Sequence, residues 1–449
     1  MKFLRYVILG FTFFNFLLTD LHQAASIDQI ASLLTSSTKV VEEIKFNFGL
    51  FQTHHLQSVC EQLGISPQIV QSLRPCTPVQ NGMLAMFTHS HGEVYYNRMA
   101  LRFPAPLDKK ILKEAWSTVM AQHDMLRTGF VQLQDQHNPF AMVTYHKNSE
   151  LPWCDTSTSM ADTSGVQENH ALENLHQPPW RIEVEAGDNT STMHFSALHA
   201  IYDAQSLATI IADVRAAYEG KALAMPAPVT ETLGPILLES KSQSESAKSF
   251  WKELAPEVQP SKFPDLHPIR TNERTLLTTS VYCAQSRKAL EDACRDIGVT
   301  LQAAGQAAWA RLLSAYTGES NVTFGTVLSG RNLSTAAEHA VFPCLVTVPT
   351  PLRIEGSNRQ LLGRTLKRNA LLVKNQFASL SHIQRWLGSD EPLFDTLFVY
   401  QKFTSDAVGT DGWKIIDEET NIDVGRISRV GIPHSFAGFT LTFTVPRLY

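Results

Sequence analysis

The chain has 449 residues, of which 43% are hydrophobic and 18% charged, and its formal net charge is -5. This composition excludes a disordered chain, and the length suggests roughly two to three domains with sizeable cores. Nucleic acid is not expected as a partner, because phosphate binding needs clustered Lys and Arg and the sequence has no dense basic stripe.

The N-terminal residues 1–25 have the pattern of a secretory signal. Basic residues near the start precede an apolar run at 6–18, and small residues follow at 24–26. The apolar run is too short to span a bilayer comfortably. Residues 19–31 also form one continuous polar-to-helical pattern, which cleavage would divide. The sequence leaves both interpretations open.

The next segment, residues 35–72, is first polar and rich in Ser and Thr and then helix-like at 54–64, and it predicts a linker with a small amphipathic element. Thr77 then precedes Pro78, a pair typical of a helix N-cap and first helical position. Periodicity predicts these further elements: strands at 95–103, 128–132 and 140–145, and a helix at 108–123.

The central stretch, LHAIYDAQS at 198–206, joins a strand pattern to a helix pattern. Alternating apolar residues from Met193 end at His199, and helical spacing begins after Asp203. An imidazole at a strand end near a carboxylate is a candidate acid/base site. His194 does not extend it to a metal site, because five positions along a strand place it on the face opposite His199.

After the central helix, residues 221–246 contain Pro, Thr and Ser and predict a connection between two lobes. A similar order of elements follows: helices at 247–254, 286–298, 300–317 and 360–376, and strands at 276–282, 322–328, 346–352 and 393–400. The sequence therefore predicts two α/β lobes of comparable size.

Several catalytic motifs are absent from the sequence. It contains no P-loop, no G-x-G-x-x-G turn and no G-x-S-x-G elbow, which disfavours nucleotide hydrolysis, dinucleotide redox chemistry and esterase-type serine catalysis. The six cysteines are dispersed without a C-x-x-C pair, which favours buried thiols in a reducing compartment. A reaction that depends on positioning and one imidazole remains, and acyl transfer fits that description.

Six ordered blocks resemble the condensation domains of nonribosomal peptide synthetases, over roughly residues 70–410. The blocks are PCTPVQNG at 75–82, QHDMLRTGF at 122–130, LHAIYDA at 198–204 in the place of HHxxxDG, AKSFW at 247–251, VTFGTVLSGR at 322–331 with FP at 342–343, and SHIQRW at 381–386 with FDTLF at 394–398. The later blocks are similar to those of fungal siderophore synthetases of the ferrichrome type.

The resemblance implies a fold of two chloramphenicol-acetyltransferase-like lobes, arranged as a V-shaped pseudodimer with a central tunnel. The corresponding division is a start at 1–34 that resembles the tail of a peptidyl carrier domain, a linker at 35–72, an N-terminal lobe at 73–235 and a C-terminal lobe at 236–449. The closing strands of the family are not recognisable after about residue 425, so the second lobe is expected to be incomplete.

The resemblance also implies the site residues. His199 matches the second His of the motif, which projects into the tunnel and acts on the acceptor amine. Asp203 matches the motif aspartate, which is structural and pairs with an arginine, here Arg331 or Arg127. A helix-start carboxylate that binds free backbone N–H groups is an equally good interpretation of Asp203. Gln80 and Tyr202 are interpreted either as tunnel-lining residues or as core and capping residues.

Two residues depart from the family motif. Leu198 replaces its first His, and Ala204 replaces its glycine. Because Leu198 lies on the strand face opposite His199, its effect is expected on packing before chemistry. Ala204 permits fewer backbone conformations than glycine and is expected to affect the turn that presents His199.

The implied function is amide bond formation between a donor acyl thioester and an acceptor amine, both carried on the phosphopantetheine arms of carrier domains, in siderophore assembly. The expected partners are donor and acceptor carrier domains and other synthetase modules, with no metal, no cofactor of its own and no membrane contact. Alternatives are a degenerate module that binds carriers without chemistry, and a free-standing H-x-x-x-D acyltransferase that uses coenzyme A thioesters. A cytoplasmic location is expected, with secretion as the alternative if residues 1–25 act as a signal.

Overall fold

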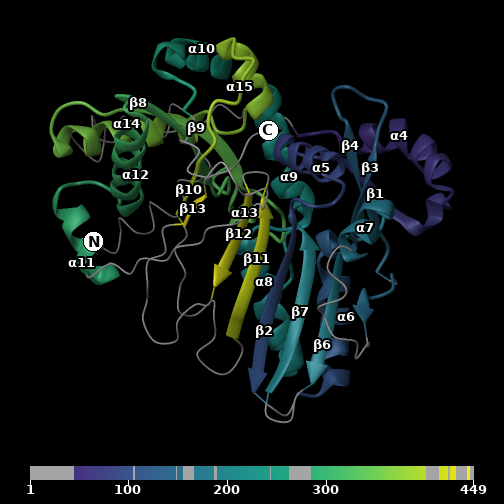
Figure 1. Cartoon of the computed structure of the whole chain (residues 1–449). Coiled ribbons are helices and arrows are strands. Elements are labelled where there is room, and N and C mark those ends of the chain that lie inside the picture. The colour runs from purple at the N-terminus through teal and green to yellow at the C-terminus, as the bar shows by residue number, and fades with distance from the viewer. Residues whose placement is uncertain are drawn as a thin grey trace, which may run out of the picture.

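The computed structural model describes most of the chain between Lys45 and Thr444 (Figure 1). The described ranges are 45–104, 107–147, 149–154, 166–186, 190–242, 244–261, 285–400, 414–422, 425–430 and 442–444. Their strands form three sheets of six, four and three strands, with helices packed against them. The α/β class predicted from the sequence is confirmed.

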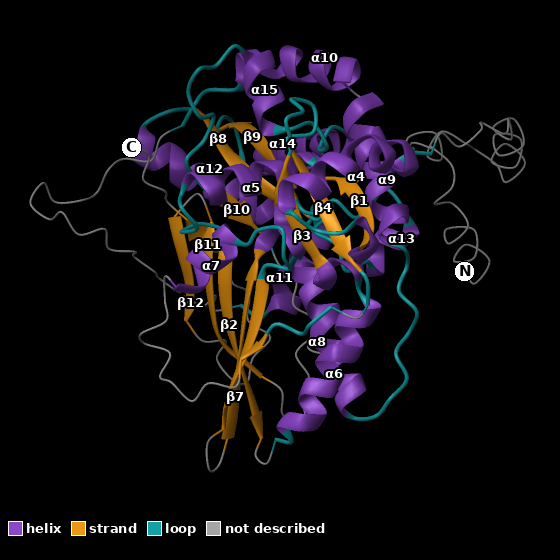
Figure 2. Ribbon diagram, turned by 90° about the vertical axis from the view of Figure 1, so that its right-hand side faces the viewer, coloured by secondary structure: helices purple, strands orange, loops and turns teal. Residues whose placement is uncertain are grey.

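The six-stranded sheet carries the predicted site at the end of its strand β7. Its order is β12 (Gly425–Val430), β11 (Lys414–Ile422), β2 (Tyr96–Pro104), β7 (Thr190–Leu198), β6 (Trp180–Ala186) and β5 (Trp153–Cys154). Helices α6 (Lys109–Gln122) and α8 (Ala204–Tyr218) cover one face of this sheet (Figure 2). Trp116 of α6 stacks on Phe195 of β7 with ring centroids 5.5 Å apart, and both are fully buried. The apolar stripe of the helix and the inward residues of the strand therefore share one core.

The three-stranded sheet packs against the helix that precedes it in the chain. Its order is β1 (Val70–Pro75), β4 (Phe140–Tyr145) and β3 (Thr128–Gln132), and helix α4 (Phe48–Leu63) lies beside β1. The described part of the segment predicted as a linker at 35–72 holds α4, which is longer than the helix-like element predicted at 54–64, and the first residues of β1. The helical hydrophobic pattern of α4 is weak in the sequence, because the helix buries only a narrow stripe formed by Phe51, Val59 and Cys60.

The four-stranded sheet belongs to the second half of the chain. Its order is β13 (Thr442–Thr444), β10 (Leu397–Val399), β8 (Asn321–Leu328) and β9 (Val346–Arg353), and β10 runs parallel to β8. The helices of this half are α10 (Ser244–Leu254), α11 (Arg287–Asp296), α12 (Leu301–Thr317), α14 (Asn358–Lys374) and α15 (Leu380–Leu387). Fully buried Phe324 of β8 and Phe398 of β10 join Trp309 of α12 in one apolar cluster.

The chain returns from this half to the six-stranded sheet. Strand β11 pairs antiparallel with β2, with Glu418 opposite Met99, and β12 continues the sheet beyond β11 (Figure 1). The predicted boundary between 235 and 236 therefore does not separate the sheets, because strands from both sides of it share one ladder. The division into lobes, the V shape and the tunnel stay predictions.

One helix was missed where a connection was predicted at 221–246. Helix α9 (Val229–Ser242) contains Pro235, a residue that normally breaks a helix because it has no N–H to donate to the carbonyl four residues earlier. That carbonyl belongs to Glu231, and the hydroxyl of Ser334 donates to it at 3.2 Å. A side chain 103 positions away thus replaces the missing bond, which no local pattern reveals.

Most other predicted elements lie within a few residues of their observed bounds. Helix α5 (Pro78–His89) begins with the predicted Thr77 cap, and Gln80 completes a capping box. The strand predicted at 393–400 is shorter, since only Leu397–Val399 pairs as β10. The strand predicted at 276–282 and the carrier-like start at 1–34 lie outside the described residues.

The close approach of β3 to the backbone near His176 gives a stability prediction. A Cβ on Gly129 would lie 2.0 Å from the backbone oxygen of His176, so Gly129→Ala must displace backbone. We expect a loss of about 1–3 kcal/mol in the free energy of unfolding, measured by urea denaturation. The control is Gly82→Ala inside α5, where nothing lies within 4 Å and a gain of about 0.5–1 kcal/mol is expected. Equal effects at both positions would contradict the packing described for β3.

Candidate active site

The central stretch folds as a strand, a single turn and a helix. Strand β7 ends at Leu198, residues His199–Ile201 form one 3-10 turn, and α8 begins at Ala204 with Asp203 as its N-cap. The Asp203 carboxylate accepts the backbone N–H of Ser206 at 2.8 Å, as an N-cap residue does. His199, half-buried, thus stands at the end of a sheet strand, four residues before the N-cap of α8.

The imidazole of His199 is held by the residue that closes its own turn. Its Nδ1 lies 2.8 Å from the backbone oxygen of Tyr202, and its ring stacks on the Tyr202 ring with centroids 4.9 Å apart. A carbonyl oxygen can only accept, so Nδ1 carries the proton in this bond. In the neutral ring, Nε2 therefore keeps its lone pair and can accept a proton.

Asp203 forms a buried ion pair with Arg331 from the second half of the chain. Arg331 Nη2 lies 2.6 Å from Asp203 Oδ1, and the two side chains are 9% and 6% exposed. The other carboxylate oxygen, Oδ2, accepts the backbone N–H of Cys344 at 3.0 Å. The Asp203 carboxylate therefore makes both contacts considered in the sequence analysis: it caps α8 and it pairs with an arginine.

The segment that carries Arg331 is bound closely to the same carboxylate. Arg331 also donates to the backbone oxygens of Ala340 and Phe342, each at 3.0 Å. Gly330 precedes it with φ +65°, and a Cβ there would lie 1.8 Å from the backbone oxygen of Cys344. Burial raises the pKa of the Cys344 thiol to about 12, so this group stays neutral beside the ion pair at ordinary pH.

Arg127, the other arginine considered as partner of Asp203, lies elsewhere. Its Nη2 lies 2.7 Å from Asp124, and its Nε donates to the backbone oxygen of Met120 at 3.1 Å. The pairing with Asp203 is therefore wrong for Arg127. This fully buried guanidinium instead joins the end of α6 to the three-stranded sheet, through Gln71 of β1 at 2.6 Å.

Gln80 and Tyr202 are core residues in this structure. Gln80 is 0% exposed; its Oε1 accepts the N–H of Thr77, and its Nε2 donates at 2.9 Å to the backbone oxygen of Ala200. Tyr202 is 4% exposed. Both residues are thus buried in the core in the arrangement described, and Gln80 also joins α5 to the turn that carries His199. A tunnel-lining role stays a prediction.

Comparison with known proteins identifies the family. A family model for the condensation domain matches residues 70–446. The chain belongs to the condensation domain family. The match continues past residue 410, where the resemblance was expected to end. Condensation domains of nonribosomal peptide synthetases generally catalyse amide bond formation.

Related sequences are fungal synthetases. The chain is 42% identical over 415 residues to the nonribosomal peptide synthetase sidC of Arthroderma benhamiae, which covers 90% of this chain and 8% of that protein. It is 29% identical over 357 residues to the hydroxamate-type ferrichrome siderophore peptide synthetase of Schizosaccharomyces pombe, covering 76% and 7%. The condensation domain thus spans less than a tenth of the length of either synthetase.

Solved structures share the fold. The first condensation domain of the calcium-dependent antibiotic synthetase, in complex with a substrate analogue, superposes with a TM-score of 0.61 at 17% identity, over 84% of this chain and 91% of that one. The X-domain from teicoplanin biosynthesis gives the same TM-score at 17% identity, over 83% and 89%. The chloramphenicol-acetyltransferase-like fold expected from the resemblance is confirmed.

The two departures from the family motif fit the local structure of this condensation domain. Leu198 is 0% exposed and belongs to the large apolar core beside α6 and α8. Ala204 occupies the first position of α8, where helical backbone suits alanine. The turn that presents His199 therefore does not depend on a glycine after Asp203.

Three residues near His199 were not identified from the sequence. Tyr95 accepts the backbone N–H of His199 at 2.8 Å, Asn97 donates to the Tyr202 hydroxyl at 2.9 Å, and Ser206 Oγ lies 2.8 Å from Asp203 Oδ1. The only local signal was at Ser206, which follows Asp203 at a spacing typical of a capping contact. The other two contacts join positions about a hundred residues apart.

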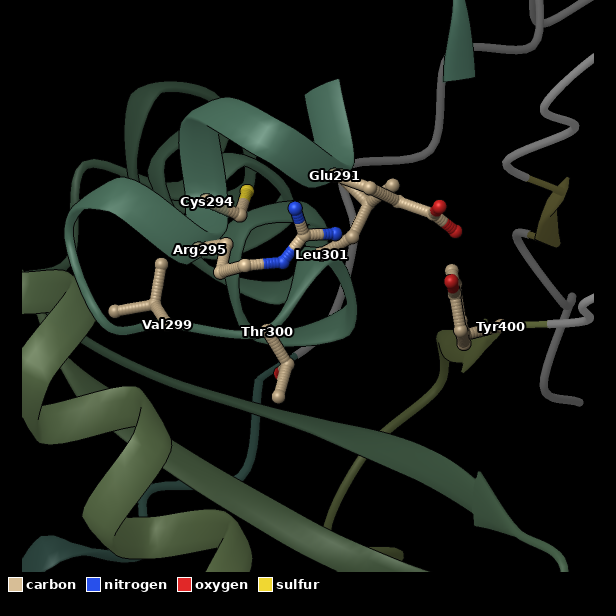
Figure 3. Close-up of a pocket in the computed structure, with 7 residues that line it drawn as sticks. All are labelled: Glu291, Cys294, Arg295, Val299, Thr300, Leu301 and Tyr400. Atoms are coloured by element: carbon tan, nitrogen blue, oxygen red, sulfur yellow. The ribbon is translucent and has the colours of Figure 1, made fainter. Parts of the chain in front are cut away.

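A cavity of about 320 Å³ lies away from these residues (Figure 3). Its lining residues come from α11, the segment leading into α12, and Tyr400, and they include Glu291, Cys294 and Arg295. None of the predicted site residues lines it. In the described ranges, no group of three or more His, Cys, Asp or Glu side chains could hold a metal ion, and no helix is long and apolar enough to cross a membrane.

The ion pair gives a stability prediction. Arg331→Met leaves the buried Asp203 carboxylate without its charged partner, and we expect a loss of about 3–5 kcal/mol in the free energy of unfolding. The control is Arg295→Gln, which removes a 72% exposed arginine paired with Asp292; there the expected loss is about 0–1 kcal/mol. Urea denaturation followed by circular dichroism measures both. An Arg331 effect as small as the Arg295 effect would show that the pair does not hold the two segments together.

Proposed function

We propose that this condensation domain forms an amide bond between a donor acyl thioester and an acceptor amine, both presented on phosphopantetheine arms of carrier domains. One observation carries the proposal: the Tyr202 carbonyl fixes the proton of His199 on Nδ1 and leaves Nε2 as the basic nitrogen. His199 is half-buried, so part of the residue stays exposed at the end of β7. The identity to fungal siderophore synthetases supports siderophore assembly as the pathway.

In the proposed reaction, the amine nitrogen attacks the thioester carbonyl, so the C–N bond forms as the C–S bond breaks. His199 Nε2 accepts one proton from the amine and returns it to the departing thiolate. The products are the amide on the acceptor arm and a free thiol on the donor arm. Much of the rate would come from holding two tethered reactants together, with the imidazole adding general base catalysis.

The remaining residues support this site without touching the reacting atoms. Asp203 and Arg331 hold the start of α8 against the second half of the chain, and Gln80 holds the turn through Ala200. Arg127 supports the fold at a distance. The phosphopantetheine belongs to carrier domains, which are the proposed partners together with further synthetase modules. The cytoplasmic location, and secretion as its alternative, concern residues outside the described ranges and stay predictions.

A single-turnover assay with donor and acceptor units loaded on carrier proteins tests the proposal. We expect His199→Ala to lower the rate of amide formation by about 10²–10⁴-fold, since general base catalysis supplies a factor of this size. The matched control is His146→Ala, an exposed histidine after β4, with an unchanged rate expected.

Other outcomes distinguish the alternatives. Equal carrier binding without product from either the unsubstituted chain or His199→Ala would favour a degenerate carrier-binding module and contradict the proposal. Turnover of soluble coenzyme A thioesters without carriers would point instead to a free-standing acyltransferase. Unchanged amide formation by His199→Ala would exclude His199 as the base.

A further inference from the structure

The start of strand β2 lies against the candidate catalytic turn from the neighbouring strand. β2 pairs with β7 antiparallel, with Tyr96 opposite Leu198 and Asn97 opposite Ala197. The backbone N–H of His199 continues this ladder by donating to the Tyr95 oxygen at 2.8 Å. Residues 95–97 therefore contact the end of β7 at the point where His199 leaves the sheet.

Asn97 extends this contact to the side chain that holds the imidazole. It is 0% exposed, and its Nδ2 donates to the Tyr202 hydroxyl at 2.9 Å. Tyr202 in turn contacts His199 twice, because its backbone oxygen binds Nδ1 and its ring stacks on the imidazole with an interplanar angle of 27°. The amide of Asn97 thus fixes the far end of the ring that supports His199.

The backbone of this strand start is unusual. Tyr95 has φ +65°, a value that is costly for a residue with a side chain and persists where surrounding contacts impose it. Two such contacts are present. The backbone oxygen of Tyr95 accepts the N–H of His199, and Asn97, two residues after Tyr95, donates to the Tyr202 hydroxyl. Unfavourable backbone beside a candidate reacting group is typical of a site whose geometry is imposed by the fold.

We propose that Asn97 and the Tyr202 hydroxyl are positioning residues, which fix the ring orientation and the tautomer of His199. The inference rests on the proposed role of His199 as the base. The Tyr202 ring is held at its hydroxyl end, so it cannot turn away from the imidazole without breaking a buried hydrogen bond. The donor and the acceptor of that bond would then both be buried without a partner, which is costly. The proton therefore stays on His199 Nδ1, which donates it to the Tyr202 carbonyl oxygen, and Nε2 stays available to the amine.

The competing explanation is that this hydrogen bond only stabilises the core. Tyr202→Phe separates the two, because it removes only the hydroxyl by which Asn97 anchors the ring. The unanchored ring can then turn away from the imidazole, so that Nδ1 is no longer held at the backbone oxygen. Asn97→Leu combined with Tyr202→Phe replaces both polar partners with apolar groups, so no buried donor or acceptor of the pair is left unsatisfied. Thr128→Val is the matched control, since it removes a buried hydroxyl that lies 2.9 Å from Thr144 Oγ1 in the three-stranded sheet.

The first measurement is the ¹⁵N NMR spectrum of histidine-labelled protein, which distinguishes a protonated from an unprotonated ring nitrogen. The His199 signals are assigned by their loss in His199→Ala. We expect one tautomer, with the proton on Nδ1, in the unsubstituted chain and in Thr128→Val. Tyr202→Phe and the double variant are expected to show a mixture of tautomers. A single Nδ1–H tautomer in folded Tyr202→Phe and in the folded double variant would overturn the proposal.

The second measurement is the carrier-based single-turnover rate, compared with the KM for the loaded acceptor carrier. We expect Tyr202→Phe to lower the rate by about ten- to a hundredfold at unchanged KM, because misplacing a reacting group has an effect of this order. Thr128→Val is expected to change neither. Should the unsubstituted chain form no amide, the proposed function fails while the NMR result still decides whether Asn97 and Tyr202 orient the ring.

Discussion

The buried ion pair between Asp203 and Arg331 is the contact on which the candidate site depends. Removing two charges from water is costly and is offset only where the remaining hydrogen-bonding groups of both ions find partners. Here Ser206 and the backbone of Cys344 serve the carboxylate, while backbone oxygens at 340 and 342 serve Nη1 and Nη2 of the guanidinium. Its buried Nε has no hydrogen-bond partner among the described residues, so part of this cost is not offset. The pair joins residues 128 positions apart, so it fixes where helix α8 starts relative to the second half of the chain. The turn of His199 lies just before that helix start and is positioned with it.

This arrangement explains why one motif contains two residues with different duties. Both carboxylate oxygens of Asp203 accept hydrogen bonds in capping α8 and pairing with Arg331, which supports the structural role proposed for it. His199 has one ring nitrogen committed to a carbonyl oxygen and the other free of that bond. The hydrogen bonds around the carboxylate fix the position of the turn, and the tautomer of the imidazole fixes which ring nitrogen carries the lone pair. The proposed base needs both, because a base is effective only when its lone pair is held toward the proton that it removes.

Elements with a local sequence pattern were predicted from the sequence. Elements and contacts that depend on residues far apart in the chain were predicted less well. Helix α6, strand β3 and the Thr77 cap were found because periodicity and capping act over a few residues. Helix α9 was missed because a proline argues against a helix, and the Ser334 hydroxyl that donates to the freed Glu231 carbonyl lies 103 positions away. His199 and Asp203 were recognised through their motif, whereas Asn97 carries no local signal and contacts Tyr202 only because β2 and β7 are neighbours. Arg127 was considered as a partner of Asp203 only through the family resemblance, whereas its charged partner in the structure is Asp124, three residues before it.

The return of β11 to the sheet of the first half limits how related chains can be recombined. A junction anywhere in 221–246 would take β2 from one parent and β11 from another, although the two strands share a ladder with an irregularity between Ile415 and Asp417. A mismatch there would leave an unpaired row of backbone groups on β2, an edge that invites aggregation. Chimeras that exchange half of this domain therefore need to carry the strand at 414–422 with the N-terminal parent, so that the inherited unit is defined by the sheet and not by position along the chain.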